Sequence, residues 1–67
     1  MKEYHIKILS RWQYLTRAPE ENIVETWGEF EDSIPFLTRH RAKECRRELR
    51  NRGYDSLFDL WIKSLSY

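Results

Sequence analysis

The shortness of this chain limits its fold more than any other feature, because 67 residues can enclose only one hydrophobic core. Small domains often compensate for a thin core with disulfides, yet the only cysteine is Cys45 and no intramolecular disulfide can form. Aromatic residues make up 15% of the sequence, and their large buried area is the expected substitute. We predict a single domain over residues 1–67. Stability is marginal at this size, so the sequence leaves a homodimer open.

Hydropathy along the chain gives no sign of a membrane segment. The longest apolar run covers only residues 60–62, whereas about 20 residues are needed to span a bilayer. The first residues alternate between polar and apolar side chains, while a signal peptide carries an unbroken apolar block. These patterns predict a cytoplasmic protein with no membrane partner.

Apolar periodicity in the first half of the chain predicts β-strands. Residues 3–14 carry apolar side chains at every second position, which is typical of a half-buried strand. Its predicted apolar face contains Tyr4, Ile6, Ile8, Trp12 and Tyr14. Residues 15–22 include a proline and an asparagine with little periodicity, so we expect a loop there. β-branched and aromatic residues return over residues 23–30 and indicate a second strand.

The residues between Thr38 and Gly53 predict a helix. Thr38 suits the N-cap, Gly53 suits the left-handed residue beyond the C-terminal end, and strong helix formers lie between them. At 100° per residue, Ala42, Cys45 and Leu49 fall within about 60° of one another. This narrow apolar stripe is suited to packing on a sheet.

The final segment, residues 54–67, fits two interpretations. Its apolar residues match a helical face, but Phe58, Leu60 and Ile62 also match one face of a strand. We favour a strand, because a helix packed across three strands buries more apolar surface than a helix packed on a hairpin. The predicted fold is a small α+β domain with one helix on an antiparallel sheet of two to three strands. The predicted order is β-β-α-β, with a helical last element as the alternative.

The sequence contains no recognisable motif for catalysis or metal binding. Paired-cysteine zinc spacing, the His-Glu-x-x-His pattern, a glycine-rich phosphate loop and the Gly-x-Ser-x-Gly turn are all missing. His5 and His40 fall on the polar sides of their predicted elements, as ordinary solvated histidines do. Cys45 is expected to be a small core residue, although neighbouring arginines would lower the pKa of an exposed thiol. We predict a non-enzymatic protein with no catalytic residue, metal or cofactor.

Charge is strongly segregated along the chain, although the net charge is only +1. Residues 19–37 carry six acids and no base, whereas residues 38–53 carry seven bases and two acids. On a helical wheel, one sector about 100° wide contains most of these bases. The sector consists of Arg39, Lys43, Arg46, Arg47 and Arg50. The planar guanidinium of arginine suits bidentate contact with carboxylate or phosphate, so the sector predicts an anionic partner.

Both charged segments also allow purely structural interpretations. Acids near Glu29 would neutralise the first helical turn, where the helix dipole disfavours cations, and the other bases would be solvated. Glu25 and Glu29 would pair across strands with Lys7 and Arg11 and fix only the register. Trp27 shares their predicted face, and it is either a partner-binding anchor or a tryptophan covered by the helix.

Two functions follow from this pattern. We first expect a protein-binding module that uses Trp27 with Glu25 and Glu29, the basic helical sector, or both. By analogy, without a shared motif, such modules resemble the small accessory inhibitors of phages and mobile elements that occupy a surface of host machinery. The alternative is a nucleic-acid-binding protein in which the basic sector contacts phosphates and Tyr54 stacks on a base. A sequence pI near 7.9 argues against this alternative, because nucleic-acid-binding domains are usually basic overall.

Overall fold

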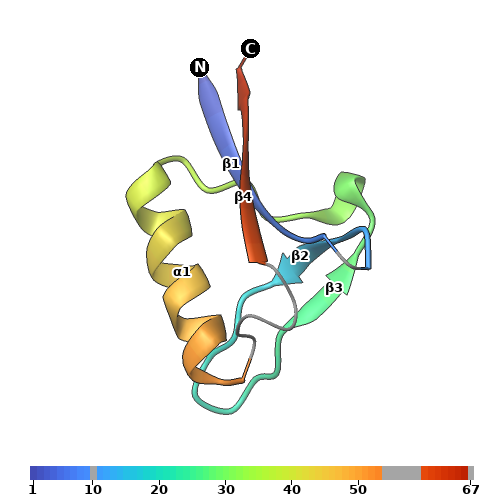
Figure 1. The fold of residues 1–67 in the computed structure, drawn as a ribbon, viewed down its shortest axis with the longest axis vertical. Coiled ribbons are helices and arrows are strands. Elements are labelled where there is room, and N and C mark those ends of the chain that lie inside the picture. Colours follow the sequence, from blue (N-terminus) through green and yellow to red (C-terminus); the bar gives the residue numbers. More distant parts are fainter. Residues whose placement is uncertain (10, 54–59, 67) are drawn as a thin grey trace.

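The computed structural model describes residues 1–9, 11–53 and 60–66, which form an antiparallel sheet and one helix (Figure 1). The α+β class is confirmed, but the sheet has four strands, in the order β3-β2-β1-β4, and the helix lies between β3 and β4 in the sequence. The elements are β1 (Lys2–Ile8), β2 (Gln13–Arg17), β3 (Thr26–Gly28), the 3₁₀ turn η1 (Phe30–Asp32), α1 (Arg39–Asn51) and β4 (Leu60–Ser66).

The predicted single strand over residues 3–14 is wrong, because the chain reverses within it. β1 and β2 form a hairpin in which Lys7 pairs with Tyr14. Trp12 lies in the turn with a left-handed backbone, at φ 55°, and its side chain is 77% exposed. The usual hairpin signal is an Asn-Gly or Asp-Gly pair, and this turn has neither. The alternation of apolar and polar residues therefore runs through the reversal and resembles one strand.

The predicted loop over residues 15–22 and the predicted strand over residues 23–30 are both too long. The first segment contains part of β2, and the Leu15 side chain is fully buried. The second segment contains only the three residues of β3. Ile23 instead exchanges two backbone hydrogen bonds with Glu20, with N···O distances of 3.0 and 3.2 Å, which closes the connection between β2 and β3.

The helix agrees closely with its sequence signals. The Thr38 hydroxyl accepts a hydrogen bond from the Arg41 backbone N–H at 3.2 Å, so Thr38 is the N-cap. Gly53 follows the C-cap with φ 115°, a left-handed conformation that glycine adopts without strain. The predicted apolar stripe faces the core, since Ala42 and Leu49 are fully buried.

The prediction that the last segment contains a strand is confirmed, because residues Leu60–Ser66 form β4. It pairs antiparallel with β1, from Leu60 opposite Ile8 to Ser66 opposite Lys2. Leu60 and Ile62 are buried, whereas Trp61 is 58% exposed on the other face. Tyr54, Phe58 and the other residues of 54–59 lie outside the described residues.

One hydrophobic core lies between α1 and the inner face of the sheet. Its buried members come from the helix and from three strands: Ile6, Ile8, Leu15, Ala42, Leu49, Leu60 and Ile62. Half-buried residues pack against them: Tyr4, Trp27, Ile34, Phe36 and Cys45. In the described part of the chain, no helix is long and apolar enough to cross a membrane.

His5 lies on the outer face of the sheet as predicted, but it is not solvated. The residue is 3% exposed, and its ring lies 4.9 Å from the Phe30 ring, measured between centroids. Its Nδ1 is 2.7 Å from the Ser33 hydroxyl, and its Nε2 is 3.3 Å from a carboxylate oxygen of Glu3. The histidine therefore holds the chain around η1 against β1.

Candidate functional site

The predicted basic sector forms a continuous basic ridge along one side of α1. The basic ridge consists of Arg39, Lys43, Arg46, Arg47 and Arg50, all exposed except the half-buried Arg46. Among the described residues, none of the five forms an ion pair. The helical side chains that pair with described acids lie outside the ridge. Arg52 forms an ion pair with Glu48 at 3.1 Å, and His40 lies 2.9 Å from Glu44, a contact that is an ion pair only when the imidazole is protonated.

The pKa of Arg46, in the middle of the basic ridge, is lowered below its ordinary value. Partial burial is the largest cause, and the positive charges of Arg50 and Arg39 add to it. Like charges held this close repel one another, and a bound anion would relieve that repulsion. The ridge is therefore suited to binding a negatively charged group.

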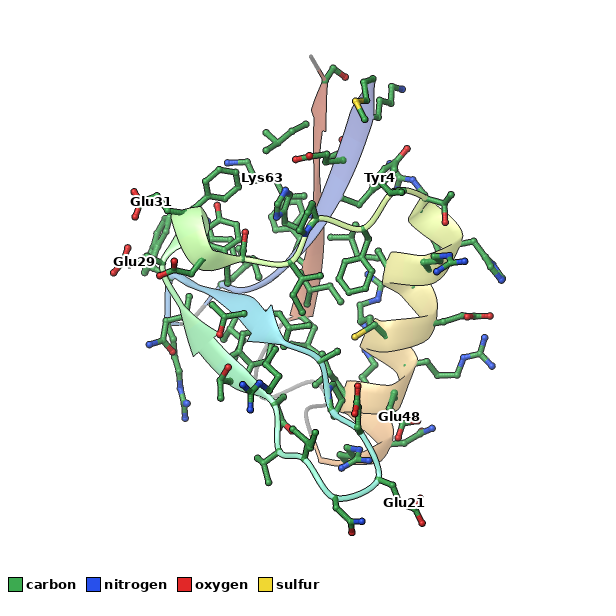
Figure 2. All side chains as sticks on the ribbon, turned by 180° about the vertical axis from the view of Figure 1, so that it is seen from behind. Tyr4, Glu21, Glu29, Glu31, Glu48 and Lys63 are labelled. Carbon is green, nitrogen blue, oxygen red and sulfur yellow. The ribbon has the colours of Figure 1, made fainter. Side chains whose placement is uncertain are left out.

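Arg39 connects the basic ridge to the sheet. Its guanidinium carbon lies 5.3 Å from the centre of the Tyr4 ring on β1, close enough for a cation–π contact. Such a contact compensates in part for a cation in the first helical turn. The acids around Glu29 do not neutralise this turn, because η1 and α1 lie on opposite sides of the molecule (Figures 1 and 2).

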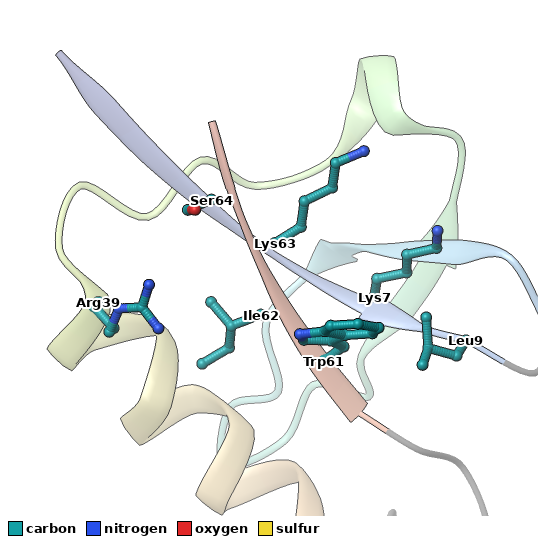
Figure 3. A pocket seen from close by; sticks show the side chains of 7 residues that line it. All are labelled: Lys7, Leu9, Arg39, Trp61, Ile62, Lys63 and Ser64. Atoms are coloured by element: carbon teal, nitrogen blue, oxygen red, sulfur yellow. The ribbon is translucent and has the colours of Figure 1, made fainter. Parts of the chain in front are cut away.

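A surface pocket with a volume of about 510 Å³ lies where the start of α1 approaches β4 (Figure 3). Arg39 points into this region from the helix toward Ile62. Among the described residues, the lining contains three basic side chains and no acidic one: Lys7, Leu9, Arg39, Trp61, Ile62, Lys63 and Ser64. Because residues from both faces of β4 contribute, the pocket extends around the long side of this strand.

The register of β1 shows which backbone groups of β4 are free. Tyr4 exchanges two backbone hydrogen bonds with Phe36, at 2.9 and 2.8 Å, on the side of β1 away from β4. Backbone direction alternates along a strand, so the next residue, His5, directs its N–H and C=O toward β4. Its register partner there is Lys63, which therefore bonds to β1.

It follows from the same alternation that Ile62 and Ser64 direct their backbone N–H and C=O away from β1. Among the described residues β4 pairs with β1 alone, so these groups lie on an edge of the sheet. We call this side of the strand the β4 edge. It runs past Arg39 and presents hydrogen-bond donors and acceptors beside a concentration of positive charge.

The acidic part of the predicted partner site lies elsewhere. β3 pairs with β2 and not with β1, so Glu25 and Glu29 do not face Lys7 across neighbouring strands. Trp27 is opposite Leu15 in the register and packs against the core, half-buried. In Figure 1, α1 lies on the left of the molecule and β3, an edge strand of the sheet, on the right. The structure thus brings the five basic residues together and separates them from Trp27 and its acids.

The sequence reasoning missed a cluster of lysines and aromatic rings on the outer face of the sheet. The Lys7 ammonium lies 4.4 Å from the centre of the Trp12 ring and 5.5 Å from that of Tyr14. The Lys63 ammonium lies 3.5 Å from the Tyr14 hydroxyl, and Trp61 is opposite Lys7 in the register. Only the position of the hairpin turn reveals this cluster, because the turn decides which face Trp12 and Tyr14 share.

The surroundings of Cys45 disfavour the ionised, reactive form of its thiol. Burial, with a smaller contribution from the charge of Glu48, raises the pKa of the Cys45 thiol to about 11. The neighbouring arginines therefore do not activate this half-buried thiol. In the part of the chain that the structure describes, no three histidine, cysteine or acidic residues are grouped so that they could hold a metal ion.

Comparison with known proteins gives no match, whether to a family model, to a curated protein or to a solved structure. Function is therefore inferred from the basic ridge and the β4 edge themselves.

Proposed function

We propose that this protein is a small non-enzymatic protein-binding module that holds an acidic surface of its partner against the basic ridge and the β4 edge. The observation that carries the proposal is the ridge itself, whose five cations form no ion pair with any described residue. Concentrated charge of one sign speeds association with an oppositely charged partner and excludes partners of like charge.

The distribution of charge over the whole molecule supports a protein partner over a nucleic acid. Glu29 and Glu31 lie at the corner of the molecule away from α1 (Figure 2), and the net charge is only +1. A polarised molecule of this kind orients itself on a partner with a defined charge pattern. Blocking a partner by occupying its surface, the role suggested by analogy with phage accessory inhibitors, requires no more than such a contact.

Charge reversal on the ridge tests this proposal. We expect Arg46→Glu with Arg50→Glu to lose the partners that the wild-type protein captures from a lysate of its source cells. Lys2→Glu with Arg17→Glu is the matched control, because both residues are exposed, lie on strands, and give the same change in net charge. Circular dichroism verifies that each variant is folded. Equal capture by the wild type and both variants would contradict the proposal.

The second candidate function is nucleic-acid binding by the basic ridge, which the absence of ion pairs to described residues also favours. If about three to five of its side chains contact phosphates, the logarithm of DNA affinity falls with the logarithm of salt concentration at a slope of about −2.7 to −4.5. A titration at low salt that shows no binding eliminates this candidate.

A further inference from the structure

We propose that the β4 edge takes up an extended acidic segment of the partner as a fifth strand of the sheet. This docking mode rests on the protein-binding function proposed above and specifies how the partner is held.

The β4 edge is suited to strand addition because, within the described part of the chain, it lacks most of the usual protection of a sheet edge. Natural sheets protect their edges with prolines, bulges, charged side chains, very short strands, or a helix or loop that covers the edge. β4 has seven residues without a proline, carries Lys63 as its single charge, and keeps an unbroken register with β1. The backbone groups of Ile62 and Ser64 are therefore available to an added strand, as in other cases of strand addition.

The side chains beside the edge indicate the chemistry of the added strand. Alternate residues of a strand point to opposite faces of a sheet. On the α1 side, the added residues would meet Arg39, which lines the pocket with Ile62 and Ser64, and carboxylates suit that position. On the outer side they would meet the exposed Trp61, which suits apolar residues. The occupant is thus a segment that alternates acidic and apolar residues.

A second copy of this chain is a poorer occupant. Antiparallel pairing of two β4 edges about a two-fold axis leaves both copies of α1 on the same face of the joined sheet. The side of each helix that carries Arg39 then faces the same side of the other helix. Like charges facing each other disfavour the pair, whereas an acidic strand is attracted to both Arg39 and the rest of the ridge.

A synthetic probe tests the docking mode without knowledge of the partner. The probe is a peptide of about eight residues that alternates glutamate and valine, and its charge-reversed control alternates lysine and valine. With the glutamate peptide at about 1 mM, we expect amide hydrogen exchange at Ile62 and Ser64 to slow about tenfold or more, and exchange at Lys63 to change little. No binding at this concentration, or protection without this alternation, would overturn the proposal.

Two variants locate the contact. Ser64→Pro removes an N–H that points to the free edge, so we expect a folded protein with about tenfold weaker peptide binding, while Ser64→Ala leaves binding unchanged. Arg39→Gln, which leaves the backbone untouched, is also expected to weaken binding about tenfold. Unchanged binding by both Ser64→Pro and Arg39→Gln would overturn the docking mode.

The outcomes separate this inference from the proposed function. If charge reversal on the ridge abolishes partner capture but Ser64→Pro retains it, the protein is a binding module that does not use strand addition. If light scattering shows a dimer and the Ile62 and Ser64 amides are already protected in the free protein, a second copy occupies the edge and the proposal is wrong.

Discussion

The two edges of the sheet differ in length, regularity and charge. The β3 edge has three residues, lies next to a register irregularity between Leu15 and Arg17, and is flanked by Glu25 and Glu29. The β4 edge has seven residues in unbroken register beside a helix rich in arginine. Short, irregular and charged strands resist pairing with other chains, and long regular strands invite it. Among the described residues, the β3 edge therefore has features that resist pairing with another chain, and the β4 edge lacks most of them, as the proposed docking mode requires.

The largest effect is expected from truncating the inner face of β4. Ile62 is 7% exposed and belongs to the core, so Ile62→Ala is expected to reduce the free energy of unfolding by about 2 to 5 kcal/mol. Trp61→Ala, on the opposite face of the same strand, is the matched control, with an expected change of less than about 1 kcal/mol. Urea denaturation measures both. A similar loss for both variants would contradict the assignment of the two faces.

A smaller loss is expected when proline is placed on the β1 side of β4. Lys63→Pro removes a backbone donor that bonds to β1 and is expected to cost about 1 to 3 kcal/mol in unfolding free energy. Ser64→Pro, which removes a donor on the free edge, is expected to cost less than half as much. If the Ser64 variant proves the less stable of the two in urea denaturation, the assigned direction of the β4 backbone is reversed.

The flank of α1 that faces the sheet is expected to behave differently from the basic ridge. Because the pKa of Cys45 is raised to about 11, alkylation by iodoacetamide near pH 8 is expected to be at least about tenfold slower than for a free cysteine. Unfolding stability is expected to fall as the pH rises from about 9 toward 11, since the unfolded thiol ionises before the folded one. Mass spectrometry follows the first effect. Alkylation as fast as in the denatured protein would contradict the raised pKa of Cys45.

The smallest effect is expected on the ridge itself. Arg50→Gln removes one of the like charges that act on Arg46, so the unfolding free energy is expected to change by no more than about 0.5 kcal/mol, upward at low salt. Lys2→Gln, at the exposed start of β1, serves as the control. A loss well above this limit would mean that Arg50 makes a stabilising contact and is not reserved for a partner.

Local features of the sequence were sufficient for α1 and for the basic ridge. The cap at Thr38, the left-handed Gly53 and the positions of the bases depend only on residues close in sequence, so the helical period places them correctly. The partner function assigned to these bases stays a prediction.

Features that depend on contacts between distant parts of the chain could not be predicted from the sequence. The hairpin turn at Trp12 contains no glycine to mark it. The alternation of apolar and polar residues therefore continues through the turn, and the sequence predicts one strand where the structure has two. The β4 edge could not be predicted either, because it exists only when β1 lies between β2 and β4 in the sheet. For the same reason the exposed position of Trp12 could not be predicted from the sequence, and whether Trp61 or the row of Leu60 and Ile62 faces outward stayed open.

Amide hydrogen exchange along β4 in the free protein tests the central claim most directly, namely that this strand has one bonded side and one open side. We expect slow exchange at Trp61, Lys63 and Leu65, because their backbone N–H groups point toward β1. We expect fast exchange at Ile62 and Ser64, because their backbone N–H groups point to the open edge. Uniformly slow exchange along the strand would mean that the edge is already covered and would contradict the claim.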